Sequence, residues 1–414
     1  MRGVTVKNPL ARVLAWRRVV LMIVGLPLVI SLAALAYAWP ASRIAPRDLP
    51  VGIVGTSAAS QSAVEGMTRN VPGGFDFHLY PDQTSARSAI MNREVYGAFV
   101  IAPGRVTVLE ATAASTSVAQ LLRTSGQQLA AHAVKLPQKP FVPDVHDASH
   151  RPNGRKDVAK APAKVTVKTV DVVPTSAEDP RGVVFTAALL PLTICGILIA
   201  ALITLSTLHL PGWRRVIDLI AVCAVGGLAA YLVAQGILGA LPHNHLATYA
   251  SLSLTLLAIS ATSAGLIRLL GHPGLGASAV LMVFVGNPFS GSTSAPELLP
   301  KAVDDIGQWL PPGAGANLMR STAYFDGNAS GSHIAVLVLW CVLGLTSVVF
   351  ARRTLTVLGD TVEEDSHESH ESDAHAADEP AGALVAATAG AAAASPSGVP
   401  QDRHAHHARH ALHD

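Results

Sequence analysis

Apolar residues are concentrated in six runs along this chain. The first run extends from Val19 to Trp39, and a long polar stretch, residues 40–181, follows it. The other runs lie close together, at residues 182–208, 216–240, 246–267, 275–289 and 333–351. A helix needs about 20 mostly apolar residues to cross the hydrocarbon core of a bilayer. We therefore predict an α-helical integral membrane protein with six transmembrane helices and a large domain between helices 1 and 2.

The fifth and the first of these runs differ from the rest. Residues 275–289 form the shortest run, which ends at Gly286-Asn287-Pro288, and we expect this helix to thin or bend at its outer end. In the first run, Ala36-Tyr37-Ala38 resembles the cleavage site of a secretory signal peptide. The apolar part of a signal peptide usually has only about 7–15 residues, so we favour an uncleaved membrane anchor.

Lysine and arginine residues mark alternate ends of the predicted helices. They precede helix 1, separate helices 2 and 3 and helices 4 and 5, and follow helix 6: Arg2, Lys7, Arg12, Arg17, Arg18, Arg214, Arg215, Arg268, Arg352 and Arg353. The turn 241–245 contains neither residue type. Because basic loops stay on the cytoplasmic side, we predict that both termini are cytoplasmic. Residues 40–181, 241–245 and 290–332 are then external. The composition, 50% hydrophobic and only 14% charged, also favours a membrane protein.

Residues 40–181 alternate between strand and helix patterns. Apolar runs and period-2 alternation predict strands at 51–55, 75–80, 96–102, 105–109 and 165–173, and helical spacing predicts helices at 57–69, 81–94 and 116–134. We therefore predict an α/β extracytoplasmic domain. Residues 136–162 are rich in Pro, Lys, Asp and His, and we expect a disordered insert there. The three cysteines, Cys195, Cys223 and Cys341, fall in predicted helices and are interpreted as apolar packing residues.

The two ends of the chain carry different signals. Asn8-Pro9 is typical of a helix start, and the apolar residues after it share one face. We expect residues 1–18 to form a cytoplasmic amphipathic N-terminal helix on the membrane surface, and an ordinary basic flank is the alternative. Residues 352–414 predict a disordered, histidine-rich cytoplasmic tail. Its histidines could bind a transition metal, but they lack a fixed ligand spacing, so we assign no metal site.

The external loop 290–332 holds the densest group of unusual residues. Apolar residues follow helical spacing after Pro296-Glu297-Leu298-Leu299-Pro300, which predicts a short amphipathic helix with Trp309 as an interfacial anchor. We expect Pro311-Pro312-Gly313 to end it and a second helix to cover 317–324, with Arg320 in it. Glu297 and Arg320 could pair, although exposed pairs contribute little. The simplest alternative is a helical hairpin that packs on the outside without a further role.

Several kinds of chemistry have no motif in this sequence. It contains no GxxxxGK[ST] phosphate loop, no HExxH, no GxSxG and no paired CxxC. Asp218 is the only acidic residue within a predicted transmembrane helix, and it lies at the cytoplasmic end beside Arg214 and Arg215. A proton relay would need acids at mid-membrane depth. The formal net charge of +2 and the lack of a basic aromatic patch give no indication of nucleic-acid binding.

Together these features resemble the permease subunits of ABC-2-type exporters. The resemblance is greatest to the branch with a large external domain between helices 1 and 2, the phage-infection-protein-like membrane proteins of high-GC bacteria. It covers about residues 5–355. It depends on Leu49-Pro50-Val51-Gly52-Ile53-Val54, Ala86–Val100, Asp179-Pro180-Arg181-Gly182, Asn287-Pro288-Phe289-Ser290-Gly291 and Pro296–Arg320.

The resemblance implies a transport permease of the bacterial plasma membrane rather than an enzyme. Two six-helix units would form a homodimer or heterodimer, bound to a separate cytoplasmic ATP-binding-cassette ATPase, and would move an amphiphilic or lipid-like substrate outward. The family's ATPase contacts map onto the N-terminal helix and the loop between helices 2 and 3: Arg12, Trp213, Arg214 and Arg215. Its external gate maps onto Asn287, Pro288, Pro296, Glu297, Pro300, Trp309, Pro311, Pro312 and Arg320. No cofactor is expected in this subunit.

Other classes of function share parts of this pattern. A non-transporting receptor or envelope scaffold would use the external domain to bind a partner. A proton-driven exporter half has the same arrangement of one helix, a domain and five helices, but it needs the mid-membrane acids that this sequence lacks. A membrane enzyme would need a polar constellation at the helix ends. An ATPase that binds this chain would favour the permease over all three.

Overall fold

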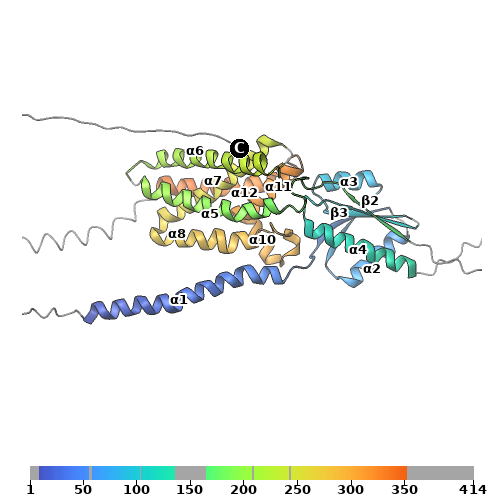
Figure 1. Ribbon diagram of the computed structural model, residues 1–414, viewed down its shortest axis with the longest axis horizontal. Coiled ribbons are helices and arrows are strands. Elements are labelled where there is room, and N and C mark those ends of the chain that lie inside the picture. The colour runs from blue at the N-terminus through green and yellow to red at the C-terminus, as the bar shows by residue number, and fades with distance from the viewer. Residues whose placement is uncertain are drawn as a thin grey trace, which may run out of the picture. The chain divides into compact units, whose positions relative to one another are not determined.

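The computed structural model describes residues 9–55, 58–102, 104–135, 165–207, 209–241 and 244–351. Within these ranges, the side chains of residues 9–22, 26, 58–59 and 132–135 are not described. The predicted insert 136–162 and the predicted tail 352–414 lie outside the described residues. Most of the described residues are helical, and they include a five-stranded β-sheet (Figure 1).

The sheet domain contains strands of both directions. Its strands are β1 (Leu49–Val54), β2 (Phe75–Tyr80), β3 (Gly97–Ala102), β4 (Arg105–Glu110) and β5 (Thr166–Asp171), in the order β2-β1-β3-β4-β5. β1 is parallel to β2 and β3, β4 is antiparallel to β3, and β5 is parallel to β4. Each strand lies within a few residues of its predicted position. The α/β character predicted for this region is confirmed.

Three helices cover the sheet. α2 (Ala58–Asn70) and α4 (Thr116–Lys135) bury Met67 and Leu122 against Leu49, Ile53 and Phe99 on one face. α3 (Gln83–Met91) packs on the other face. The helix predicted over 81–94 is a few residues too long. The chain leaves α3 at Asn92 and adopts a left-handed conformation (φ 62°) at Arg93.

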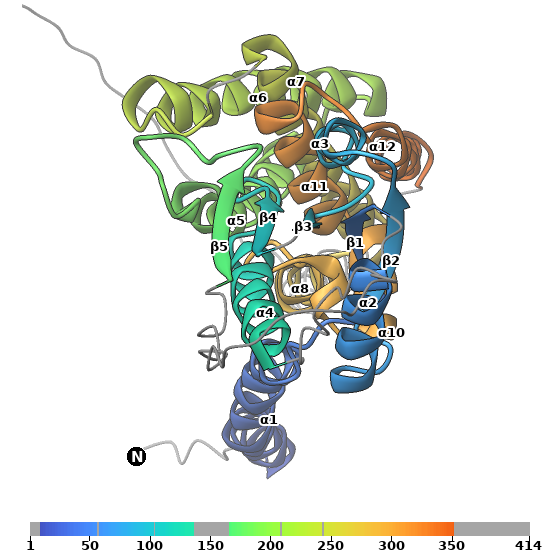
Figure 2. The ribbon, with the colours of Figure 1, turned by 90° about the vertical axis from the view of Figure 1, so that its right-hand side faces the viewer.

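Five helical segments in the described part of the chain are long and apolar enough to cross a membrane. They lie in α1 (Pro9–Ser42), α5 (Val183–Ser206), α6 (Gly212–Tyr231, extended by a π-helix over Leu232–Ile237), α7 (His245–Leu270) and α12 (Gly331–Phe350). α7 is the most buried of the five, and α5, α6 and α12 pack around it. Figure 2 shows α1 apart from this group. α1 contacts residues 280–289 instead, where the Tyr37 hydroxyl donates to the Val283 carbonyl at 2.9 Å.

The fifth predicted transmembrane helix, residues 275–289, is not one of these five segments. Residues 272–289 form three successive elements: α8 (His272–Ala279), a π-helix (Val280–Gly286) and the short α9 (Asn287–Phe289). The irregularity begins earlier than predicted, at Val280. Pro288 cannot donate a backbone hydrogen bond, so the regular α-helical ladder is incomplete in this turn. The Asn287 side-chain amide donates to the Met282 carbonyl at 3.3 Å, and the same carbonyl accepts from the Asn287 backbone N–H.

The loop 290–332 departs from its predicted form. A short 3₁₀ turn (Pro296–Leu298) leads to α10 (Lys301–Trp309), and α11 (Pro311–Tyr324) follows at once. The predicted stop at Pro311 does end α10, but it also begins α11, because proline fits the first turn of a helix. Every residue of α11 is buried. α11 is therefore not a surface element of this loop: it packs against α7 and α12.

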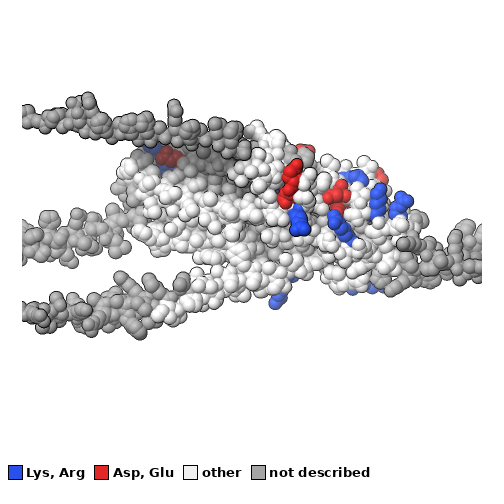
Figure 3. All heavy atoms as spheres, in the orientation of Figure 1, with Lys and Arg blue, Asp and Glu red and all other residues white. Residues whose placement is uncertain are grey.

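At each end of the bundle, polar side chains donate hydrogen bonds to backbone carbonyls. At the domain end, Ser176 and Tyr324 donate to the carbonyls of Gly239 (2.7 Å) and Ala240 (2.6 Å). At the opposite end, here called the far end, Arg215 and Arg268 are buried and donate to the carbonyls of Thr207 (2.8 Å) and Ala351 (3.0 Å). On the face in Figure 3, charged side chains gather near these two ends, and the described atoms between them are uncharged. This distribution is typical of a multi-pass membrane protein.

Glycine residues allow four helices to approach α7 closely. They lie on α5, α6, α11 and α12: Gly196, Gly227, Gly315 and Gly344. A Cβ atom at any of them would lie within 2.7 Å of an α7 atom. Small residues at such contacts are how membrane helices pack without a hydrophobic driving force between them.

We expect Gly344→Ala to destabilise the bundle by about 1–3 kcal/mol, the usual cost of overpacking. The added methyl would lie 2.3 Å from the Ala261 backbone carbon, which cannot move aside as a side chain can. Gly331→Ala is the matched control, because nothing lies within 4 Å of its Cβ position. Thermal unfolding of both variants in detergent tests this packing. Equal unfolding temperatures would contradict it.

Candidate functional site

The sheet domain and the bundle meet in a polar contact, here called the junction. The segment between α1 and β1 is bonded to the 3₁₀ turn: the Ala45 and Arg47 amides donate to the carbonyls of Leu298 and Glu297, both at 3.0 Å. On the other side, the Asn328 amide donates to the Met91 carbonyl at 3.1 Å. These bonds fix the position of the loop that follows α3 relative to α11.

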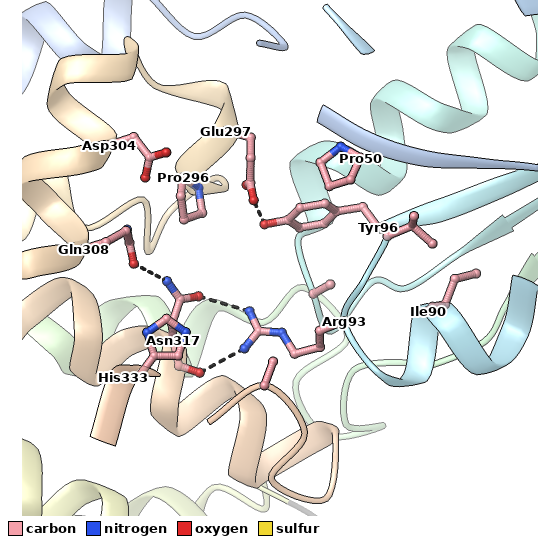
Figure 4. A pocket seen from close by; sticks show the side chains of 13 residues that line it. Pro50, Ile90, Arg93, Tyr96, Pro296, Glu297, Asp304, Gln308, Asn317 and His333 are labelled. Carbon is pink, nitrogen blue, oxygen red and sulfur yellow. Dashed lines mark hydrogen bonds between the residues drawn. The ribbon is translucent and has the colours of Figure 1, made fainter. Parts of the chain in front are cut away.

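Arg93 links that loop to α11. Its Nη1 donates to the Asn317 carbonyl (3.1 Å) and to the Ser321 hydroxyl, and its Nη2 donates to the Asn317 side-chain oxygen (3.1 Å). Its guanidinium also lies 5.5 Å from the centre of the Phe325 ring. Figure 4 shows Arg93 pointing from the sheet domain toward Asn317. The left-handed backbone at Arg93 is what turns the chain out of α3 at this point.

Asn317 joins two arginines to α10. Its side-chain oxygen accepts from Arg93 and also from Arg320 Nη1, at 3.5 Å. Its amide nitrogen donates to Gln308 at 2.6 Å, and Gln308 donates to the Ser290 carbonyl at 3.3 Å. Each side chain in this chain of contacts therefore has a partner.

Arg320 lies deeper, on α11, and is 5% exposed. Its Nη2 donates to the Ser292 carbonyl at 3.1 Å, and its guanidinium lies 4.8 Å from the centre of the Phe185 ring. Burial, and repulsion from Arg93, lower the pKa of Arg320 to about 10. Arg320 therefore stays charged at neutral pH.

The predicted pairing of Glu297 with Arg320 is not found. Among the described residues, neither Arg93 nor Arg320 forms an ion pair. The Glu297 carboxylate instead accepts from the Tyr96 hydroxyl at 2.7 Å. Arg320 is also buried rather than exposed, so the weak surface pair expected from the sequence does not apply. Burial, with the negative charge of Glu297, raises the pKa of Tyr96 well above its ordinary value.

A cavity of about 230 Å³ lies within the junction. It is lined by Pro50, Ile90, Arg93, Val95, Tyr96, Ala114, Pro296, Glu297, Asp304, Gln308, Asn317, Ala329 and His333 (Figure 4). Asp304, on α10, is one of the two acids in this lining. Burial raises the pKa of Asp304 to about 6, and the nearby charges of Glu297 and Asp305 add to the effect. Asp304 Oδ1 is buried without a hydrogen-bond partner.

The structure places the predicted gate residues in three positions. Pro296 and Glu297 line the junction cavity, and Arg320 lies behind it. Asn287 is buried in the bundle, where Thr193 donates to it at 3.4 Å, and Pro288 follows it in α9. The others belong to α10 and α11: Pro300 caps α10, Trp309 is exposed at its end, and Pro311 and Pro312 form the first turn of α11.

The predicted ATPase contacts differ in their exposure to solvent. Trp213 and Arg214 are exposed at the far end, and Trp213 is 59% exposed. Arg215 is only 3% exposed and donates to the Thr207 carbonyl, so its assignment as a surface contact is wrong. Its guanidinium instead satisfies a carbonyl at the end of α5. Arg12 lies in α1, in the part whose side chains are not described.

A second, apolar cavity lies among the helices that are long and apolar enough to cross a membrane. This groove has a volume of about 830 Å³, within the range of roughly 300–1,000 Å³ that is typical of small-molecule sites. Its lining comes mainly from α5 and α6, with contributions from α7 and α11, and includes Phe185, Pro191, Ala229, Leu252 and Met319. The lining contains no charged residue.

Sequence reasoning missed Arg93, Tyr96 and Asn317. All three belonged to segments that carried the family resemblance, but no periodicity or motif gave any of them a role. None of the known family models, curated proteins or solved structures matches this chain. The site therefore has to be interpreted from its own geometry.

We expect the free energy of unfolding to fall as the pH rises from about 4 to about 6. In this range the folded state keeps a proton on Asp304 that the unfolded state has lost, because its pKa rises from 3.8 to about 6 on folding. Asp304→Asn should remove this decline and stabilise the protein at pH 7. Chemical unfolding at several pH values measures it, with the exposed Asp326→Asn as the control. A wild-type decline that persists in Asp304→Asn would reject Asp304 as its source.

We expect Arg93→Lys to destabilise the junction by about 2 kcal/mol, because lysine keeps the charge but loses the forked donor geometry. Hydrogen exchange should become faster in α11 near Asn317 and in the loop after α3. Arg105→Lys, on an exposed position of β4, is the matched control. Unchanged exchange at α11 would show that the Arg93 contacts do not hold the junction.

Proposed function

We propose that this chain is the permease subunit of an ATP-driven exporter of the ABC-2 type, which moves an amphiphilic molecule outward. The observation that supports it most is the apolar groove of about 830 Å³ among helices long enough to cross a membrane. A cavity of this size and lining suits an apolar substrate. In the same proposal, residues 272–289 complete a sixth crossing.

The proposed orientation places the sheet domain outside a bacterial plasma membrane. Arg214, Arg215 and Arg268 lie at or near the far end, where a cytoplasmic side would carry the positive charge. The junction, at the domain end, would then be the external gate. Two irregular features near it support this role: the π-helix at Val280–Gly286 and the fully buried α11. π-helical turns are frequent at functional sites.

The proton-driven alternative receives less support. The five membrane-spanning segments of the described chain contain one acidic residue, Asp218. It lies in the second turn of α6, near the far end. Asp304, with its raised pKa, lies in α10, outside these segments. A proton path across the membrane would need titratable groups between these two positions.

The proposal is tested by reconstituting the full chain with a candidate ATP-binding-cassette ATPase in lipid vesicles. We expect the two to co-purify, and we expect the chain to change the ATPase rate. An ATPase encoded beside this chain is the first candidate. No association and no change in rate with any such ATPase would reject the permease function.

We expect Trp213→Ala and Arg214→Glu to weaken the ATPase association at least about tenfold, because exposed tryptophan and arginine side chains are frequent hot spots of interfaces. Trp309→Ala is the matched control: Trp309 is 63% exposed but belongs to α10, next to the domain end. Binding is measured by surface plasmon resonance with the chain in nanodiscs. If Trp309→Ala weakens binding as much as Trp213→Ala, the docking site is not at the far end.

A further inference from the structure

A small polar pocket adjoins the apolar groove at its domain end. Its volume is about 30 Å³, close to the volume of one water molecule. Its lining comes from the starts of α4 and α5, from the segment 292–294 and from α11. Two arginines, Arg181 and Arg320, take part, together with threonine and serine residues of these segments.

Phe185 connects the groove to this pocket. Its side chain lines both of them, and one face of its ring carries the Arg320 guanidinium at 4.8 Å. Met319, the residue before Arg320, also lines the groove. The long apolar groove therefore ends beside a compact group of cationic and hydroxyl side chains.

Positive charge at this end of the groove has no direct counter-ion. Among the described residues, neither Arg181 nor Arg320 forms an ion pair, and Arg320 donates to the Ser292 carbonyl and the Asn317 side-chain oxygen. On the same loop as Arg181, the Asp179 carboxylate accepts from the amides of Val183 and Val184, both at 2.9 Å. Glu297 accepts from Tyr96. Among the residues that the structure describes, neither acid pairs directly with Arg320, and a buried guanidinium without a directly paired anion is costly.

We propose that the groove and this pocket together bind one amphiphile, with its aliphatic tail in the groove and an anionic headgroup at Arg181 and Arg320. A phosphate or carboxylate oxygen accepts charge-assisted hydrogen bonds from guanidinium groups. The pocket admits only an oxygen or two, so the rest of the headgroup lies toward Arg181, which is exposed. Zwitterionic headgroups gain less, because their cationic part is repelled.

This inference names the substrate class of the proposed permease, but the binding it describes needs no ATPase. Native mass spectrometry of the full chain in detergent measures it directly. The probes are phosphatidylglycerol and phosphatidylcholine with the same acyl chains, and inorganic phosphate alone. We expect phosphatidylglycerol to bind about tenfold more tightly than phosphatidylcholine, and inorganic phosphate to bind much more weakly than either lipid.

Two variants separate the headgroup site from the tail site. Arg181→Gln should weaken phosphatidylglycerol about tenfold and leave phosphatidylcholine unchanged, and Arg105→Gln is its control. Ala229→Trp fills the groove from an exposed position and should weaken both lipids, whereas Ala221→Trp, also exposed on α6 but not lining the groove, should not. Arg181 and Ala229 are exposed, so neither change removes a core residue.

Three results would overturn the proposal. Equal binding of the two lipids would reject the headgroup site, and undiminished lipid binding by Ala229→Trp would reject the groove. If the chain forms a dimer and Ala229→Trp dissociates it, a second copy of the chain fills the groove instead. Lipid binding as expected, without any effect on an ATPase, would support this inference while rejecting the exporter.

Discussion

The packing of α11 is the contact on which the two halves of this molecule depend. α11 is buried along its whole length, between α7, α12 and the sheet domain. Gly315 brings it against Thr255 of α7, where a Cβ would lie 2.3 Å from the threonine side chain. Further along, Arg93 of the sheet domain donates to Asn317 and Ser321. A helix held on one side by close packing and on the other by charged donors has little freedom to shift alone.

One turn of α11 therefore takes part in both cavities. Asn317 lines the junction cavity, Met319 lines the groove, and Arg320 reaches the polar pocket between them. Any displacement of α11 that opens one of these spaces changes the other two. A ligand in the groove and a partner on the sheet domain would each bias the same element, which is the requirement for coupling two sites. The glycine contacts with α7 confine such a displacement to small steps, since packed interfaces do not deform continuously.

The sequence predicted the fold best in segments whose apolar residues follow a single periodicity, that of a strand or that of a helix. The strands 75–80 and 105–110 and the helix 116–135 follow clear alternation or helical spacing, and all are found close to their predicted ranges. Residues 275–289 were less predictable, because a π-helix has the same apolar composition as an α-helix and differs only in its hydrogen bonds. Pro311-Pro312 was interpreted only as a stop, although proline also starts helices. Composition cannot separate these two roles when another helix follows at once.

The site was less predictable than the fold, because its members come from distant parts of the chain. Glu297 and Arg320 stood out as charges in an apolar loop, but their partners, Tyr96 and Asn317, carry no pattern of their own. The identity of residue 317 decides how much of the positive charge of Arg93 and Arg320 is neutralised. An aspartate there would neutralise much of the charge of Arg93 and Arg320, whereas the amide of Asn317 only accepts one hydrogen bond from each. Arg320 therefore keeps its positive potential beside an apolar groove, where an anionic headgroup would find it least screened by water.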